Sequence, residues 1–249
     1  MSTKLVVQSD DFGMSNAGNE GVVQAFENGI LTQASVMVAC PWFRGAATLA
    51  KEHSIPVGVH LMATSEWEFY RWGPLTGGTS LRAEDGRFPR TIEQIREQAD
   101  PDDLLEEFVA QVEAFRAEGL EPEYFDCHMG VIAPEPYVEI CRRYGKPFDY
   151  PVGDVAVGFD SIHMVSSQPV GEKMPYLLDR ISALEEGKHL FVTHCAVDSP
   201  ELRAQTSETA KNRAWANEYR PSDLAGLTSA EVKELVEERG IELVSVGRL

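Results

Sequence analysis

Short apolar runs alternate with amphipathic helical patterns along most of the chain, and this alternation limits the possible folds more than any other feature. Strands that alternate with helices usually build a parallel sheet, because each helix carries the chain back to start the next parallel strand. The runs that predict strands lie at residues 5–7, 34–38, 57–59, 124–126, 161–165, 190–193 and 241–246, and the helical patterns lie at 15–29, 41–50, 100–119, 137–145, 173–186 and 228–240.

The length of 249 residues favours one closed or nearly closed sheet, since β/α barrels commonly reach roughly 250 residues as a single domain. We therefore predict an α/β chain with a single (β/α) barrel-like domain over residues 1–249. This fold would be TIM-barrel-like, and seven strands or a distorted ring would also satisfy the pattern. A doubly wound open sheet is the alternative. The 43% of apolar residues can bury a full core, which excludes general disorder.

The charge balance excludes two classes of partner. The chain carries 40 acidic and 22 basic residues, a formal net charge of −18, whereas nucleic acids and anionic membranes attract basic surfaces. No apolar stretch approaches the ~20 residues that span a bilayer, and the first residues lack the long apolar run of a secretory signal. We expect a cytoplasmic protein without nucleic-acid or membrane partners. The four cysteines include no C-x-x-C pair and predict reduced, mostly buried thiols.

Several polar side chains follow directly on predicted strands. In β/α barrels the carboxyl ends of the strands form the floor of the active site. Taken singly, each residue has an ordinary structural explanation, such as a turn, a helix cap or a hydrogen-bonded core histidine. Together they indicate one shared site. They are Asp10 and Asp11 after the first strand, His60 after the third, Asp126 and His128 at the fourth, and His194 at the sixth.

Two histidines and a carboxylate form a recurrent set of ligands for a divalent metal. Three protein ligands leave coordination positions open, which is the catalytic rather than the structural arrangement. A second carboxylate beside the first points elsewhere and can take a proton from water, and a further histidine can protonate a leaving group. A bound metal also lowers the pKa of its water toward ~7. These parts describe metal-assisted hydrolysis of an amide or ester.

Five segments resemble one family, the YdjC/ChbG-type carbohydrate deacetylases. Residues 8–15, QSDDFGMS, resemble the family's N-A-D-D-F-G-x-S opening, and residues 28–35, NGILTQAS, resemble its N-G-I-V-T-S-T-S stretch. Residues 58–61, GVHL, are similar to its G-x-H-L motif, and residues 126–128, DCH, to its D-S-H. Thr193 and His194 stand where the family has C-H-P-G.

The resemblance implies a barrel-like fold related to polysaccharide deacetylases, and enzymes that remove acetyl groups from N-acetylated sugars such as chitooligosaccharides. It implies one divalent metal held by Asp11, His60 and His128. Zn²⁺ or Mg²⁺ is the expected ion, with Mn²⁺ or Co²⁺ as alternatives. Asp10 would be the general base and His194 the acid. We expect the acidic surroundings to raise the pKa of His194, and Asp198 to orient its ring.

The sequence departs from the family pattern beside these residues. The family continues D-S-H-x-H-x-H, whereas this chain has Gly130 and Ile132 in place of the last two histidines. Position 8 is Gln rather than Asn, and Ala196-Val197 replaces Pro-Gly after the histidine. The predicted metal ligands are present despite these departures, but the sequence does not determine the sugar specificity.

A polar excursion at residues 63–90 follows His60 and should lie over the metal. Four of the six residues from 67 to 72 are aromatic, and aromatic rings can match the apolar faces of sugars. We therefore predict that Trp67, Tyr70 and Trp72 bind substrate. The alternative is that they pack the loop onto the barrel or form a dimer contact.

Three classes of function fit the sequence. The favoured one is a metal-dependent hydrolase of an N-acetylated sugar or short oligosaccharide, with another amide or ester as the alternative substrate. A non-haem iron oxygenase shares the ligand set of two histidines and a carboxylate. A catalytically silent carbohydrate-binding barrel is the third, although it would have no use for Asp10 as a base. A homodimer is compatible with any of them.

Overall fold

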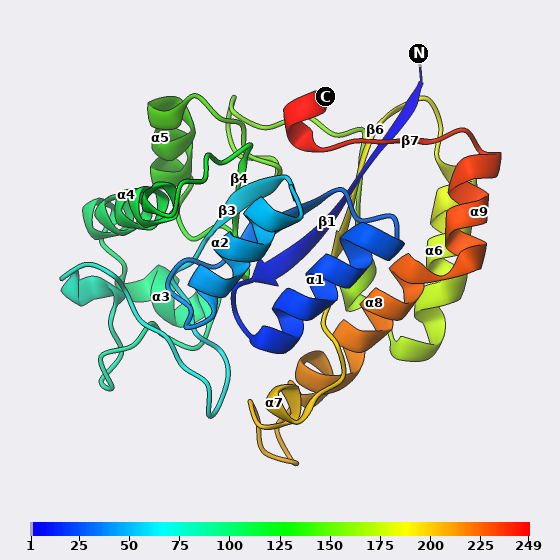
Figure 1. Cartoon of the computed structure of the whole chain (residues 1–249). Helices are drawn as coiled ribbons and strands as arrows, with labels where there is room; N and C mark the ends of the chain where they lie inside the picture. Colours follow the sequence, from blue (N-terminus) through cyan, green and yellow to red (C-terminus); the bar gives the residue numbers. More distant parts are fainter. Residues whose placement is uncertain (1) are drawn as a thin grey trace.

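A parallel, curled sheet lies at the centre of the computed structural model, which describes residues 2–249 (Figure 1). Six strands follow the order β4-β3-β2-β1-β6-β5, and β7 pairs with β1 outside this path. Every pairing between these strands is parallel. The strands are β1 (Thr3–Phe12), β2 (Gln33–Val36), β3 (Val57–Leu61), β4 (Phe125–Cys127), β5 (Ser161–Met164), β6 (Gly187–Thr193) and β7 (Glu242–Leu243).

The predicted barrel-like α/β fold is confirmed in this curled, half-barrel form. Among the described residues, the edge strands β4 and β5 do not pair with each other, so the sheet is not a closed eight-stranded ring. Residues 147–156 lie along β4 instead, through isolated bridges from Phe148 to Phe125 and Ala156. Because both ends of the chain contribute strands to one sheet, the fold supports the proposal of a single domain over residues 1–249.

Helices surround the outer side of the curled sheet (Figure 1). Figure 1 shows α1 and α2 in front of it, α4 and α5 on one side, and α6, α8 and α9 on the other. Local signals explain several helix ends: the Asp100 side chain caps α4 next to Pro101, and Gly145 ends α5 at φ +66. The helices are α1 (Asn16–Asn28), α2 (Phe43–Glu52), α3 (Ile92–Gln98), α4 (Pro101–Ala117), α5 (Pro134–Tyr144), α6 (Lys173–Ala183), α7 (Pro200–Arg203), α8 (Arg220–Thr228) and α9 (Ala230–Glu238).

Apolar side chains fill both faces of the sheet, as expected for parallel strands covered by helices. On the concave face a separate cluster contains Val6, Leu190, Val192 and Tyr124, all fully buried. Tyr124 lies against Gly58 of β3, where an added Cβ would stand 2.6 Å from the ring. This cluster fills the interior of the curled sheet below the carboxyl ends of the strands. The polar side chains at those ends therefore lie against packed apolar residues.

The chain between β6 and α9 differs most from the prediction. No helix was predicted from the sequence between residues 194 and 227, whereas α7 lies in this stretch and α8 begins in it. Pro221 in the first turn of α8 and the spacing of Leu224 and Leu227 were the available signals. The final strand β7 is also shorter than the predicted 241–246.

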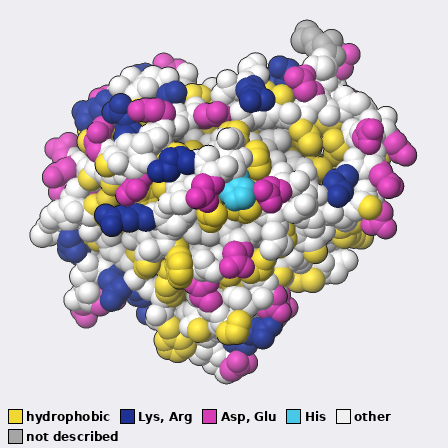
Figure 2. Space-filling model, viewed as in Figure 1, with side chains coloured by type: hydrophobic (Ala, Val, Ile, Leu, Met, Phe, Trp, Pro, Cys, Tyr) yellow, Lys and Arg dark blue, Asp and Glu magenta, His cyan; other side chains and the backbone are white. Residues whose placement is uncertain are grey.

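The face of the molecule shown in Figure 2 carries acidic and basic side chains together. Figure 2 shows Lys and Arg side chains scattered among acidic ones on the face in view, rather than gathered into a basic patch. Among residues 2–249, no helix combines the length and the apolar composition that crossing a bilayer requires.

Candidate metal centre

A bulge in β1 places Asp10 and Asp11 at the same site. The pairing of β1 with β2 shifts register between Ser9 and Phe12, so β1 has one extra residue there. Asp11 occupies the left-handed region at φ +63, which Asp tolerates better than most residues. Neighbouring side chains of a regular strand point to opposite faces, but this bulge lets both carboxylates line one pocket.

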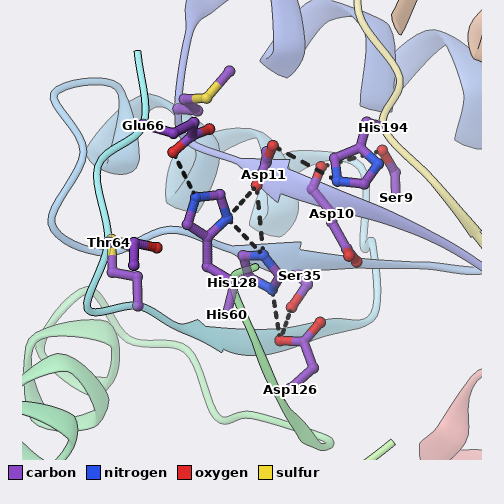
Figure 3. A network of polar contacts seen from close by, with 12 residues as sticks. Ser9, Asp10, Asp11, Ser35, His60, Thr64, Glu66, Asp126, His128 and His194 are labelled. Carbon is purple, nitrogen blue, oxygen red and sulfur yellow. Dashed lines mark hydrogen bonds and ion pairs between the residues drawn. The ribbon is translucent and has the colours of Figure 1, made fainter. Parts of the chain in front are cut away.

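Three buried ligand atoms form a nearly equilateral triangle above the floor of the sheet (Figure 3). Asp11 Oδ1 lies 3.5 Å from His60 Nε2 and 3.2 Å from His128 Nδ1, and the two nitrogens are 3.3 Å apart. Ligands about 2.1 Å from a metal at tetrahedral angles stand ~3.4 Å from one another. Asp11 Oδ1 is buried without a hydrogen-bond partner in the described structure. These residues therefore fit a divalent metal, and they are the three that the sequence singled out.

A second carboxylate lies beside the far nitrogen of each histidine. His60 Nδ1 lies 2.9 Å from Asp126 Oδ1, and His128 Nε2 lies 2.9 Å from Glu66 Oε2. Such partners fix the ring orientation and the tautomer of metal-binding histidines. Burial opposes the charged form of His128, but Glu66 and Asp11 outweigh it and raise the pKa of His128 to about 10. The site thus attracts positive charge, as a cation site must.

Arg220, the first residue of α8, fixes the other oxygen of Asp11. Its Nη2 donates to Asp11 Oδ2 at 2.5 Å, and its guanidinium lies 5.5 Å from the centre of the Trp67 ring. Burial acts to raise the pKa of Asp11, but Arg220 and the nearby histidines hold that pKa well below its usual range. Asp11 therefore stays ionised with Oδ1 facing the histidines. Arg220 was not predicted from the sequence, because no residue near it in the chain indicates a partner in β1.

Asp10 belongs to a buried group of carboxylates around Gln8. The Gln8 amide nitrogen lies 2.8 Å from Asp10 Oδ1 and 2.9 Å from oxygens of Asp126 and Asp149. An amide nitrogen has only two hydrogens to donate, so it cannot satisfy three carboxylates fully. Burial, with the charges of Asp126 and Asp11, raises the pKa of Asp10 to about 7 despite the opposing charge of His60. Asp10 can therefore take up a proton near neutral pH, as a general base must.

His194 lies on the other side of Asp11, with Nε2 3.8 Å from Asp11 Oδ2. The expectation of a raised pKa is wrong. Burial lowers the pKa of His194 to about 3; Asp11 acts to raise this pKa, while Arg220, His60 and His128 act to lower it. The ring is therefore neutral at neutral pH.

The expected partner of His194 is also corrected. Asp198 is exposed and pairs with Arg203, whose Nη2 lies 2.5 Å from Asp198 Oδ2. Asp223 of α8 holds His194 instead, by accepting its backbone N–H at 2.8 Å, and Lys173 neutralises the buried Asp223. Asp223 was not predicted either, because the sequence did not indicate α8.

The three aromatic residues predicted to bind substrate occupy different places. Trp67 lines the pocket, with Nε1 3.2 Å from the sulfur of Met14. Tyr70 and Trp72 are not among the pocket-lining residues. Trp72 is buried, donates from Nε1 to the Thr64 carbonyl at 2.9 Å and packs 5.9 Å from the His128 ring. Tyr70 donates its hydroxyl to the Met14 carbonyl.

The pocket above the triangle has a volume of about 520 Å³, within the range of ~300–1,000 Å³ typical of small-molecule sites. It contains all five predicted catalytic and metal residues. Its wall also contains Trp215, which stands edge-on to the His194 ring at 5.8 Å between centroids. No pattern around Trp215 singled it out in the sequence.

Glu66→Gln should weaken metal binding about 10- to 100-fold, because the uncharged amide supports the His128 ring less strongly than the carboxylate does. Competition with a fluorescent chelator measures the affinity. Glu84→Gln, an exposed change in the same excursion, is the control and should bind metal as the unaltered protein does. Equal affinity of the two variants would contradict the role of Glu66.

Comparisons with known proteins relate this chain to one family. A model of the YdjC-like protein family matches residues 4–238. A carbohydrate deacetylase of Clostridium beijerinckii is 28% identical over 248 residues, covering 97% of this chain and 98% of that protein. The crystal structure of a putative cellobiose-phosphate cleavage protein from Enterococcus faecalis aligns with a TM-score of 0.83 at 25% identity, covering 100% of this chain and 99% of that one.

A more distant structural likeness extends to a peptidoglycan deacetylase of Bacillus subtilis. It aligns with a TM-score of 0.52 at 12% identity, covering 99% of this chain and 89% of that one, and this likeness concerns the fold alone. The family match spans nearly the whole chain and agrees with the resemblance of the motifs. This chain belongs to the YdjC-like family.

Proposed function

We propose that this protein is a metal-dependent deacetylase that hydrolyses the acetamido group of an N-acetylated sugar or short oligosaccharide. The observation that carries the proposal is the triangle of Asp11, His60 and His128, in which a buried carboxylate oxygen lacks a hydrogen-bond partner. Asp10 beside it supports hydrolysis rather than mere binding. The names of the curated relatives support a carbohydrate substrate.

Asp11, His60 and His128 would hold one divalent ion. Such an ion, when bound, acts as a Lewis acid and makes hydroxide available near neutral pH. Arg220 keeps Asp11 ionised and in place, while Asp126 and Glu66 hold the two rings. This chain therefore supplies a preorganised site, in which the ligands need little rearrangement.

Asp10 is proposed as the base that accepts a proton from the attacking water. Its raised pKa leaves it able to accept and release a proton near pH 7. His194 is proposed to assist the leaving nitrogen from the opposite side of Asp11. Because its ring is neutral at rest, it offers a hydrogen bond first and passes a proton only after receiving one from the reacting groups.

For the substrate contacts, we propose that Trp67 meets the sugar directly, since it lines the pocket. Tyr70 and Trp72 would act by holding the loop and the His128 ring.

His194→Ala should lower kcat for N-acetyl amides by about 10²- to 10⁴-fold, but lower it much less for activated acetyl esters. An amine needs a proton to leave, whereas an activated phenolate does not. The measurement compares kcat on an acetamido sugar and on an aryl acetate, with His53→Ala at the surface pair with Glu27 as the control. A similar loss on both substrates would assign His194 a structural role.

The proposed function is tested by acetate release from N-acetylglucosamine and N,N′-diacetylchitobiose. The assay uses chelator-treated protein supplied separately with Zn²⁺, Mg²⁺, Mn²⁺ or Co²⁺. We expect acetate in the presence of at least one ion and none with chelator. Absence of acetate under every condition would overturn the sugar substrate.

A further inference from the structure

The pocket continues from the metal centre across the seam between the edge strands β4 and β5. Four side chains form this part, which we call the seam wall: Met129 and Val131 after β4, Tyr150 in the span beside β4, and Met164 at the end of β5. They line the same pocket as the metal-site residues, so a substrate that reaches the metal can also extend along the seam wall.

The seam wall is apolar and open to solvent. Met129 is 47% exposed and Met164 is 37% exposed, although both are large apolar side chains. The Tyr150 hydroxyl lies 2.9 Å from the sulfur of Met164, so its one donor is directed at the wall itself. Apolar area of this kind gains most from a ligand that covers it, because water is then released.

The backbone at Met129 is strained. Its φ of +60 lies in the left-handed region, which is unfavourable for a residue with a Cβ, and Gly130 follows at φ +116. A glycine at 129 would relieve this strain. The strained turn therefore presents an exposed methionine side chain at the pocket, where it can contact a ligand.

The charges of the pocket argue against a phosphorylated ligand. Among the described residues that line it, Arg220 is the one Lys or Arg side chain, and it is buried and bonded to Asp11. The carboxylates of Asp10, Asp11 and Glu66 face the same space. Away from the ion proposed between Asp11, His60 and His128, a phosphate on the sugar would meet carboxylates and no free Lys or Arg side chain of the described pocket lining.

We propose that the seam wall binds an apolar aglycone, so that the substrate is an N-acetylated amino sugar with an alkyl or aryl group on its anomeric oxygen. The N-acetylated sugar in this inference rests on the proposed function, whereas the apolar group is inferred from the seam wall. Covering each further methylene group strengthens binding about fourfold at most, so a chain of several methylenes should produce a measurable preference.

The experiment compares the methyl and hexyl β-glycosides of N-acetylglucosamine, by acetate release and by calorimetric binding to the metal-loaded protein. We expect kcat/KM and affinity to be at least tenfold higher for the hexyl glycoside, and N-acetylglucosamine 6-phosphate to be a poorer substrate than N-acetylglucosamine. Met129→Gly, which suits the positive φ, should reduce the hexyl-to-methyl ratio several-fold. Val170→Ala, an exposed apolar residue outside the pocket, should leave the ratio unchanged.

The outcomes separate this inference from the proposed function. Equal binding and turnover of the two glycosides, or a preference for N,N′-diacetylchitobiose, would overturn the seam wall and leave the deacetylase standing. A preference for N-hexanoylglucosamine over the hexyl glycoside would also overturn it, because the wall would then hold the acyl chain. Tighter binding of the hexyl glycoside that Met129→Gly abolishes, without acetate release, would support the seam wall and reject the deacetylase.

Discussion

Replacing His128 by Ala should remove the divalent metal and with it nearly all turnover. We expect the metal affinity to fall by well over ~100-fold, more than the loss of an outer partner causes, because one of three ligands disappears. The fold should persist, since the freed partner Glu66 is 14% exposed and can be hydrated. Elemental analysis of the purified protein measures the metal, and thermal unfolding checks the fold.

His60→Ala should behave in the same way, while His53→Ala, far from the triangle, should keep full metal content. Full occupancy in both the His60 and the His128 variants would show that the metal, if any, binds elsewhere.

Replacing the two neighbouring carboxylates, Asp10 and Asp11, one at a time by Asn should have different effects. Asp10→Asn should keep the metal but lose about 10²- to 10⁴-fold in kcat, because an amide cannot accept the proton of the attacking water. Asp11→Asn should weaken metal binding itself. Asn tolerates the positive φ at position 11, so the backbone is not the cause of the difference. Metal content and kcat of the two variants are measured side by side.

Asp11→Asn leaves Arg220 without its charged partner, so thermal unfolding must accompany that variant. Equal metal loss in the Asp10 and Asp11 variants would contradict the division of roles between them.

The sequence predicted the parts of the site that depend on local patterns. Asp10, Asp11 and His60 lie near the carboxyl ends of β1 and β3, whereas His128 and His194 directly follow β4 and β6. Parallel strands place their carboxyl ends at one edge of a sheet. The register of β1, β3 and β4 then brings these side chains together in the pocket. Strand position and residue type were therefore enough to identify the ligand candidates.

The residues that support the site were not predictable in the same way. Arg220 is 209 positions from Asp11 along the chain, and Glu66 is 62 positions from His128. Such pairs depend on how α8 and the excursion after β3 pack against the sheet. Neither segment carries a periodic signal strong enough to place one side chain.

The pKa of His194 shows why overall charge is a poor guide to a buried group. The chain has a net charge of −18, which suggested an acidic environment. Within the pocket, however, burial and the nearby Arg220, His60 and His128 favour the neutral ring. Local desolvation and a single buried arginine outweigh many solvated surface carboxylates, whose fields water and salt screen.

We propose that Asp11, His60 and His128 hold the catalytic metal. Anomalous diffraction from crystals of the metal-loaded protein tests this placement, because it locates the ion. We expect one peak within about 2.3 Å of Asp11 Oδ1, His60 Nε2 and His128 Nδ1. The structure offers a second group of potential ligands, Asp10, His60 and Asp126. A peak among those three residues, or no peak in the pocket at all, would contradict the account.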